Sequence, residues 1–89
     1  MSPAGRYTIL IKGAAEREMN SLPVTAFERI TKAILALETT PRPPRAKKLQ
    51  GRSRYRLRIG DYRVLYTVSD SAREVEIVAV GHRKDVYRG

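Results

Sequence analysis

The second half of the chain alternates between apolar and polar residues with a period of two, as β-strands with one buried face do. The runs with this pattern are 54–59, 62–69 and 74–82. Gly60-Asp61 separates the first two, and a two-residue loop that begins with glycine is a strong signal of a β-hairpin. Residues 70–73 form the second connection. The pattern therefore predicts three antiparallel strands joined by two tight turns.

The beginning of the chain combines a short strand pattern with a helical one. The run Tyr7-Thr8-Ile9-Leu10-Ile11 is apolar and β-branched, which predicts a strand. Ala15, Met19 and Leu22 then follow at helical spacing, and Pro23 ends this first helix.

A second helix is predicted from a stripe of apolar residues spaced three or four apart. Its members are Ala26, Phe27, Ile30, Ala33, Ile34 and Leu37. Thr25 with Glu28 three positions later fits a capping box at its start. Pro41, Pro43 and Pro44 prevent its continuation. The predicted order is β-α-α-β-β-β, an α+β fold of one domain, residues 1–89, with an antiparallel sheet and both helices packed on one face.

The predicted hairpins sort the side chains into two faces. With Gly60-Asp61 as the first loop, Arg58 lies opposite Arg63, and with 70–73 as the second loop Arg63 lies opposite Val80. One face then carries no charge: Tyr55, Leu57, Ile59, Tyr62, Val64, Tyr66, Val68, Val75, Ile77, Ala79 and Gly81. This uncharged face is expected to bury the two helical stripes.

The opposite face of the predicted sheet has its basic residues at one end. Its members are Arg54, Arg56, Arg58, Arg63, Leu65, Thr67, Ser69, Glu74, Glu76, Val78, Val80 and His82. Two arginines directly opposite each other repel, by some tenths of a kcal/mol, unless an anion lies between them. An uncovered apolar strip, Leu65 with Val78 and Val80, is predicted beside the cluster and is a candidate site for a partner.

The net charge supports the importance of this cluster. The 89 residues include 18 Lys and Arg against 9 Asp and Glu, a net charge of +9. Residues 42–63 carry nine basic residues against Asp61 alone, so eight of the nine excess charges lie in this segment. It is either a solvated basic loop that keeps the protein soluble or a surface that binds phosphates.

Composition also excludes several classes of protein. The chain has no cysteine, which excludes disulfides, thiolate nucleophiles and cysteine-based zinc sites. It has neither a long apolar run nor the apolar start of a signal peptide. We therefore expect a soluble cytoplasmic protein that has no membrane segment.

Three segments of the chain together resemble one known family. They are Lys48-Leu49-Gln50-Gly51, the run from Tyr55 to Tyr66 through Gly60-Asp61, and Val80-Gly81-His82-Arg83-Lys84-Asp85-Val86-Tyr87. With the Leu22-Pro23 junction, they resemble the RelE branch of the RelE/ParE toxins of toxin–antitoxin pairs. The similarity extends over essentially the whole chain, and the fold of that family has the element order predicted above.

The resemblance implies a toxin that cleaves mRNA in the ribosomal A site. In such enzymes the ribose 2′-hydroxyl attacks the adjacent phosphate, which gives a 2′,3′-cyclic phosphate, without a metal or cofactor. The family's active-site residues correspond to Arg56, Arg58, Arg63, Arg83 and Tyr87. The other basic residues of the region are expected to bind RNA or the ribosome: Arg45, Lys47, Lys48, Arg52, Arg54 and Lys84.

The general base of this reaction is not assigned by the resemblance. Related enzymes often have lysine at the positions of Arg56 and Arg58, and arginine, unlike lysine, rarely releases its proton. Histidine titrates near neutral pH, and His82 is predicted on the same face as Arg63, so it is the chemical substitute. A lone histidine at a strand end is also a common surface residue.

The resemblance also implies partners and leaves alternatives. A cognate RelB-like antitoxin, expected to be acidic and amphipathic, would cover Leu65, Val78 and Val80 and neutralise the arginines. The toxin itself would be a monomer that forms a hetero-oligomer with the antitoxin, and the ribosome with its mRNA would be its target. Two alternatives remain: a ParE-like toxin that inhibits DNA gyrase without cutting RNA, and a non-catalytic RNA-binding module.

Overall fold

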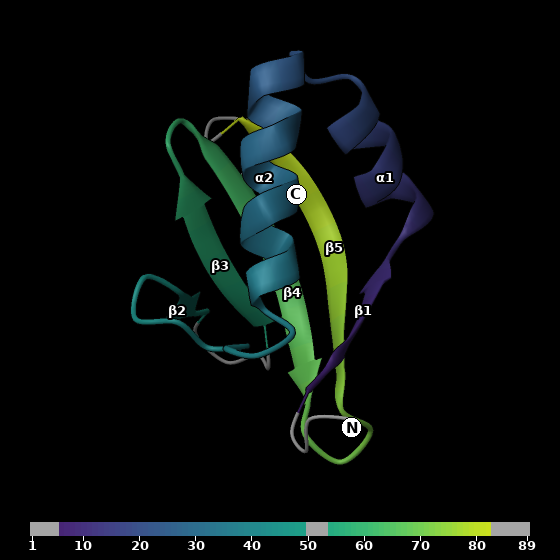
Figure 1. The fold of residues 1–89 in the computed structure, drawn as a ribbon, viewed down its shortest axis with the longest axis vertical. Helices are drawn as coiled ribbons and strands as arrows, with labels where there is room; N and C mark the ends of the chain where they lie inside the picture. Colours follow the sequence, from purple (N-terminus) through teal and green to yellow (C-terminus); the bar gives the residue numbers. More distant parts are fainter. Residues whose placement is uncertain (1–5, 50–53, 83–89) are drawn as a thin grey trace.

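The computed structural model describes residues 6–49 and 54–82. Within them, helices α1 (Gly13–Asn20) and α2 (Val24–Ala36) lie on one face of a five-stranded sheet (Figure 1). The strands are β1 (Thr8–Ile11), β2 (Lys47–Lys48), β3 (Arg54–Ile59), β4 (Tyr62–Ser69) and β5 (Glu74–His82). The predicted α+β class and element order are confirmed, and β2 is an additional short strand. Neither described helix is long and apolar enough to cross a membrane.

The sheet has the order β1-β5-β4-β3-β2, so the first and last strands of the described chain are neighbours. β1 is parallel to β5, with Ile9 opposite Val75, whereas the other pairs are antiparallel. The prediction of a wholly antiparallel sheet is wrong at this one pair. The direction of β1 is set by the two-helix connection, and alternation within a strand carries no information about direction.

The core lies between the uncharged face of the sheet and the two helical stripes. From α1 and α2 it takes Ala15, Met19, Ile30 and Ile34, all buried, as the helical spacing predicts. The predicted capping box is wrong. Pro23 is the residue before the helix, so Thr25 already lies inside the first turn and its hydroxyl makes no cap.

The first hairpin follows the predicted register. Arg58 pairs with Arg63 and Ile59 with Tyr62 around the Gly60-Asp61 loop. Gly60 has a positive φ of 60°, the conformation that the first loop residue of a type II′ hairpin needs and that glycine adopts at no cost. The two arginines therefore point from neighbouring strands to the same face of the sheet.

The second hairpin starts in the predicted register and then shifts. Ser69 pairs with Glu74 and Tyr66 with Ile77, but Leu65 pairs with Ala79, so β5 has one extra residue, Val78, at a β-bulge.

The bulge reverses the alternation in the last part of β5. Val80 consequently lies in the core, only 1% exposed, while Ala79 and Gly81 lie beside the arginines. His82 pairs with Tyr62 and contacts its ring, with ring centroids 5.9 Å apart. The predictions that Val80 and His82 lie on the basic face, and Ala79 and Gly81 on the core face, are therefore wrong. A strict period of two cannot anticipate an inserted residue.

Candidate functional site

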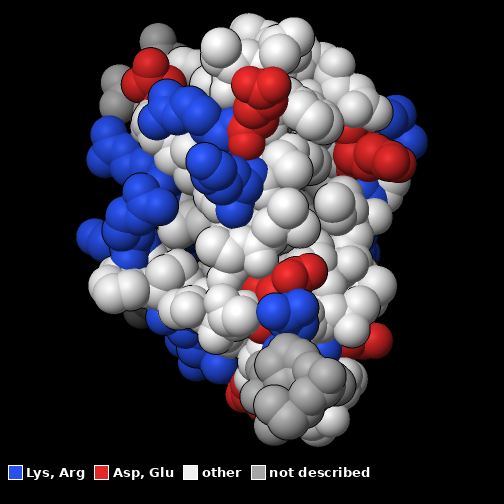
Figure 2. Space-filling model, viewed as in Figure 1, with Lys and Arg blue, Asp and Glu red and all other residues white. Residues whose placement is uncertain are grey.

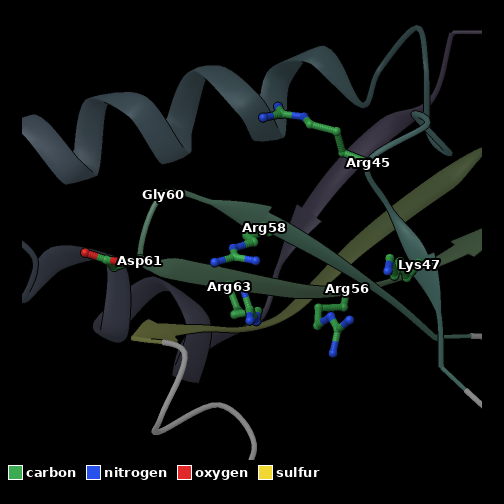
Figure 3. Close-up of a pocket in the computed structure, with 7 residues that line it drawn as sticks. All are labelled: Arg45, Lys47, Arg56, Arg58, Gly60, Asp61 and Arg63. Atoms are coloured by element: carbon green, nitrogen blue, oxygen red, sulfur yellow. The ribbon is translucent and has the colours of Figure 1, made fainter.

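A pocket of about 580 Å³ lies along β3 and the Gly60-Asp61 turn (Figure 3). We call it the basic pocket, and its lining residues are Arg45, Lys47, Arg56, Arg58, Gly60, Asp61 and Arg63. Five of these seven residues are cationic, and Asp61, the only acid, directs its carboxylate away from the arginines in Figure 3. The composition of the pocket suits a polyanion.

The sheet itself places the three arginines of the pocket. Arg56 and Arg58 are two residues apart on β3 and therefore share a face, and Arg63 joins them from β4 opposite Arg58. Their burial differs: Arg63 is only 8% exposed, Arg56 is half-buried and Arg58 is exposed. A guanidinium withdrawn from water beside a second guanidinium is a strong attractor of anions, because its charge is poorly screened.

The remaining two cations come from the segment between α2 and β2. Lys47 lies in β2 opposite Arg56, and Arg45 precedes it by two residues. We call residues 37–46 the connector. In Figure 2, Lys and Arg side chains gather along the side of the molecule where β2 and β3 lie in Figure 1. The positive surface thus continues from the pocket onto its rim.

A network of polar side chains joins the connector to the far end of the sheet. Arg42 Nη1 and Nη2 donate to the two carboxylate oxygens of Asp70, at 3.1 and 2.9 Å, and its Nε donates to the Tyr55 hydroxyl at 2.8 Å. The Tyr7 hydroxyl donates to Asp70 Oδ1 at 2.6 Å. We call these four residues the Arg42–Asp70 network. It links the connector, β3, the β4–β5 turn and the residue before β1.

The network shifts the titration of its members. The hydrogen bonds from Arg42 and then from Tyr7 lower the pKa of Asp70, because they stabilise the carboxylate. The same carboxylate raises the pKa of Arg42, and its hydrogen bond raises the pKa of Tyr7. The charged pair is therefore stable over the whole physiological pH range.

Tyr66 supports the same region from inside the core. Its ring is fully buried and stacks on Tyr55 at a centroid distance of 5.6 Å, and its hydroxyl donates to the carbonyl of Pro41 at 2.8 Å. Burial raises its pKa to about 12. Tyr66 thus lies in the core, and Tyr55 and Tyr62 of the same uncharged face pack against it, as the strand alternation predicts.

Comparison with known proteins identifies the family. The sequence model described as the ParE toxin of type II toxin–antitoxin systems matches residues 9–87. The chain belongs to the RelE/ParE toxin family. Toxin RelG of Mycobacterium tuberculosis is 32% identical to it over 86 residues, which cover 92% of this chain and 97% of RelG.

Solved structures of RelE toxins share the fold. The RelE of the archaeal RelE–RelB complex from Pyrococcus horikoshii has a TM-score of 0.80 and 30% identity, over 88% of this chain and 96% of that one. The isolated RelE toxin of Escherichia coli has a TM-score of 0.77 and 28% identity, over 92% of both chains. The sequence resemblance to RelE/ParE toxins is thus confirmed, and this protein is a type II toxin of the family.

The structure brings together only part of the site that the RelE/ParE resemblance implies. Arg56, Arg58, Arg63, Arg45 and Lys47 line one pocket. Arg54 lies on the same face further along β3, opposite Thr67, and Lys48 lies opposite Tyr55. Neither of these two lines the basic pocket. The predicted residues outside the described part of the chain are Arg52, Arg83, Lys84 and Tyr87.

The apolar strip of Leu65, Val78 and Val80, which was predicted to bind a partner, is also divided in the structure. Leu65 and Val78 remain partly exposed near the bulge, whereas Val80 is buried. The backbone amide of Val80 donates to Glu18 Oε1 of α1 at 2.8 Å, a contact between residues 62 positions apart. His82 belongs to the Tyr62 side of the sheet and does not line the pocket.

Sequence reasoning missed the Arg42–Asp70 network altogether. Arg42 counted only as one more cation of the basic segment, and Asp70 only as a turn residue. Their separation of 28 positions leaves no local pattern that joins them. The three prolines around Arg42 were a signal that side chains hold this segment. A segment without regular backbone hydrogen bonds needs side chains to fix its position.

Proposed function

We propose that this RelE/ParE toxin is a ribosome-dependent endoribonuclease that cuts mRNA in the A site. The observation that carries the proposal is the pair of arginines, Arg58 and Arg63, that face each other across β3 and β4 in the basic pocket. Like charges at directly opposed positions repel, and guanidinium forks match phosphate oxygens, so a phosphate bound between the two arginines would stabilise the pair. Its target would place the toxin in the cytoplasm.

The proposed reaction is attack of the ribose 2′-hydroxyl on the adjacent phosphate, with release of the 5′-oxygen of the next nucleotide. Charge accumulates on the phosphorane, and the buried Arg63 with Arg58 neutralises it. Arg56 holds a non-bridging oxygen in line, and Arg45 with Lys47 binds flanking phosphates. The arginines supply the cationic charge that a metal ion supplies in other nucleases, so the proposed reaction needs no metal ion bound by the toxin.

Proton transfer needs a group other than these arginines, which keep their protons. The position of His82 on the Tyr62 side removes it from our proposed set. We assign this role to Tyr87, with Arg83 as a further phosphate ligand, following the family pattern. Arg54, Lys48, Arg52 and Lys84 are proposed as contacts to RNA outside the pocket.

The proposed partner is a RelB-like antitoxin. Related RelE toxins have been solved as complexes with RelB, among them those of Pyrococcus horikoshii and Escherichia coli. We propose that an acidic antitoxin neutralises the basic pocket and contacts the partly exposed Leu65 and Val78. Protection of these two residues from hydrogen exchange in the complex would support this surface, and unchanged exchange there would contradict it.

Primer extension on mRNA in a translation extract tests the enzymatic proposal. The unaltered protein is expected to produce cuts at A-site positions, and Arg63→Ala is expected to abolish them. Arg17→Ala is the matched control, because it removes the same charge from α1, away from the pocket. Intact mRNA under active translation would overturn the proposal.

A second candidate function is inhibition of DNA gyrase, because the matching family model is the one named for ParE. A supercoiling assay separates the two functions. Loss of supercoiling in the presence of the toxin, with intact mRNA, would favour the ParE-like function. The cationic pocket would then serve a partner and not a scissile phosphate.

A further inference from the structure

The connector brings two cations to the basic pocket although it has no regular structure of its own. Arg45 lies near its end and Lys47 follows it directly. Its prolines cannot donate backbone hydrogen bonds. Its own turn is closed by the amide of Ala46, which donates to the carbonyl of Pro43 at 2.9 Å. Backbone bonds hold it at its two ends, where the Tyr7 amide donates to the Glu38 carbonyl at 2.8 Å and Lys47 enters the β2–β3 ladder, so between these points its position against the sheet depends on side chains.

Arg42 is the side chain in this segment with the most complete set of contacts. All three nitrogen atoms of its guanidinium donate hydrogen bonds, two to Asp70 and one to Tyr55. A bidentate pair of this kind fixes direction as well as distance. The Tyr7 hydroxyl also donates to Asp70 and so helps to orient the carboxylate that Arg42 binds.

The Arg42–Asp70 ion pair and the basic pocket lie on different parts of the molecule. Asp70 belongs to the β4–β5 turn, whereas the basic pocket lies around the β3–β4 turn. Neither Arg42 nor Asp70 lines the pocket. The ion pair is joined to the basic pocket through the connector, which runs from Arg42 to Arg45 and continues into β2 at Lys47.

We propose that Arg42 and Asp70 are positioning residues for the basic pocket. Their ion pair holds the connector against the sheet, so that Arg45 and Lys47 stay at the pocket wall where they bind phosphates. This inference rests on the proposed binding of RNA. It assigns to an acidic residue outside the pocket a favourable effect on the binding of a polyanion.

The positioning role and long-range electrostatics predict opposite changes in RNA binding when Asp70 is neutralised, which makes the proposal easy to test. Asp70→Asn removes one negative charge and raises the net charge from +9 to +10. Long-range electrostatics alone predict tighter binding of RNA by this variant. The positioning role predicts weaker binding, because the loss of two placed cations outweighs one distant charge.

The binding experiment uses a short single-stranded 2′-O-methyl RNA, which has no 2′-hydroxyl to react. Its affinity is measured from about 50 to about 200 mM salt. Asp70→Asn is expected to bind several-fold more weakly, with a salt slope shallower by about 1.4, which corresponds to two lost phosphate contacts at about 0.7 each. Glu74→Gln is the matched control: it makes the same charge change at the start of β5 and is expected to bind as tightly as the unaltered protein, or more tightly.

Arg42→Lys is the second variant, because it keeps the charge but loses the bidentate geometry. It is expected to reproduce the weaker binding and shallower slope of Asp70→Asn. Hydrogen exchange provides a readout that does not depend on RNA. In both variants the amides of Ala46 and Lys47 are expected to exchange faster, while those in the centre of β4 are unchanged.

Each outcome decides one part of the proposal. Unchanged exchange in the connector overturns the idea that the pair holds it. Faster exchange with unchanged or tighter RNA binding overturns its role in positioning the cations. If the unaltered protein binds no RNA, the proposed function and the positioning role both fail, and the exchange data alone then show whether the pair fixes the connector.

Discussion

Arg58 on β3 and Arg63 on β4 face each other across the first hairpin although they carry the same charge. Like charges at directly opposed positions destabilise a sheet. We expect Arg58→Thr to raise the free energy of unfolding, by about 0.2–1 kcal/mol, and at the same time to weaken RNA cleavage. Urea denaturation and primer extension measure the two effects. Arg54→Thr is the control for the stability measurement, since Arg54 faces Thr67 of β4 and its removal relieves no repulsion of this kind.

Arg63 is expected to depend on its shape as well as its charge. Arg63→Lys keeps the positive charge but replaces a planar fork by a single ammonium group. We expect cleavage to fall by about 100-fold, the scale typical of the loss of one aligned donor at a developing negative charge. Single-turnover cleavage on programmed ribosomes measures the rate. Activity close to that of the unaltered protein would show that only charge matters at this position.

Gly60 is required by the hairpin itself. Its φ of 60° is strained for any residue with a Cβ, and an added Cβ would lie 3.4 Å from the guanidinium of Arg29. We expect Gly60→Ala to lower the free energy of unfolding by about 1–2 kcal/mol. Gly13→Ala in the first turn of α1 is the matched control, because its nearest neighbour is 3.6 Å away at the end of a flexible side chain and its φ is not in the positive range. Equal effects of the two substitutions would contradict this explanation.

Asp70 makes stability depend on acidic pH. Its folded pKa is lowered, so its contribution to stability is complete above the unfolded pKa of about 3.9 and is lost as the pH falls through the lower folded value. We expect the midpoint of thermal unfolding, measured as a function of pH, to fall at pH values below about 4. In Asp70→Asn this midpoint should depend less on pH in the same acidic range. A profile with the same acid slope in both proteins would assign the loss to other carboxylates.

Tyr66 makes stability depend on alkaline pH. Its pKa is raised to about 12 in the folded protein, so its contribution is complete below the unfolded pKa of about 10 and is lost between these two values. In a titration followed by tyrosinate absorbance, one tyrosine should ionise last. Tyr66→Phe is expected to remove that late step, and its persistence would place the late group elsewhere.

His82 is expected to contribute little to cleavage. It contacts Tyr62 on the helix side of the sheet, away from Arg63, so it is not placed to take a proton from RNA in the pocket. His82→Ala should therefore keep the cleavage rate within a few-fold and leave its pH dependence unchanged. A steep loss of rate together with an altered pH profile would restore histidine as the general base.

The sequence was sufficient for most of the fold and for the centre of the site. The helical stripes, both turns and the pairing of Arg58 with Arg63 follow from periodicity and turn chemistry, which are local properties. The parallel direction of β1 does not, because it is decided by a connection through two helices. The capping box at Thr25 failed because the proline before the helix shifted its first turn.

The wrong faces predicted for Val80 and His82 have a single structural origin, the extra residue Val78 in β5. Up to the bulge each residue lies on its predicted face, and beyond it Val80 and His82 lie on the other. A bulge has no reliable sequence signal, since it depends on how two strands fit together. Arg42 illustrates a second limit: its partner lies 28 positions away, beyond the reach of any local pattern.

The pairing of β1 with β5 has a consequence for how the chain folds during its synthesis. β3, β4 and β5 join by local turns and close soon after each is made, but Ile9 has no strand to pair with until Val75 exists. Loop closure over such a separation is slow compared with hairpin formation. The strand that is translated first is therefore completed last, and the sheet acquires this edge only when nearly the whole described chain has left the ribosome.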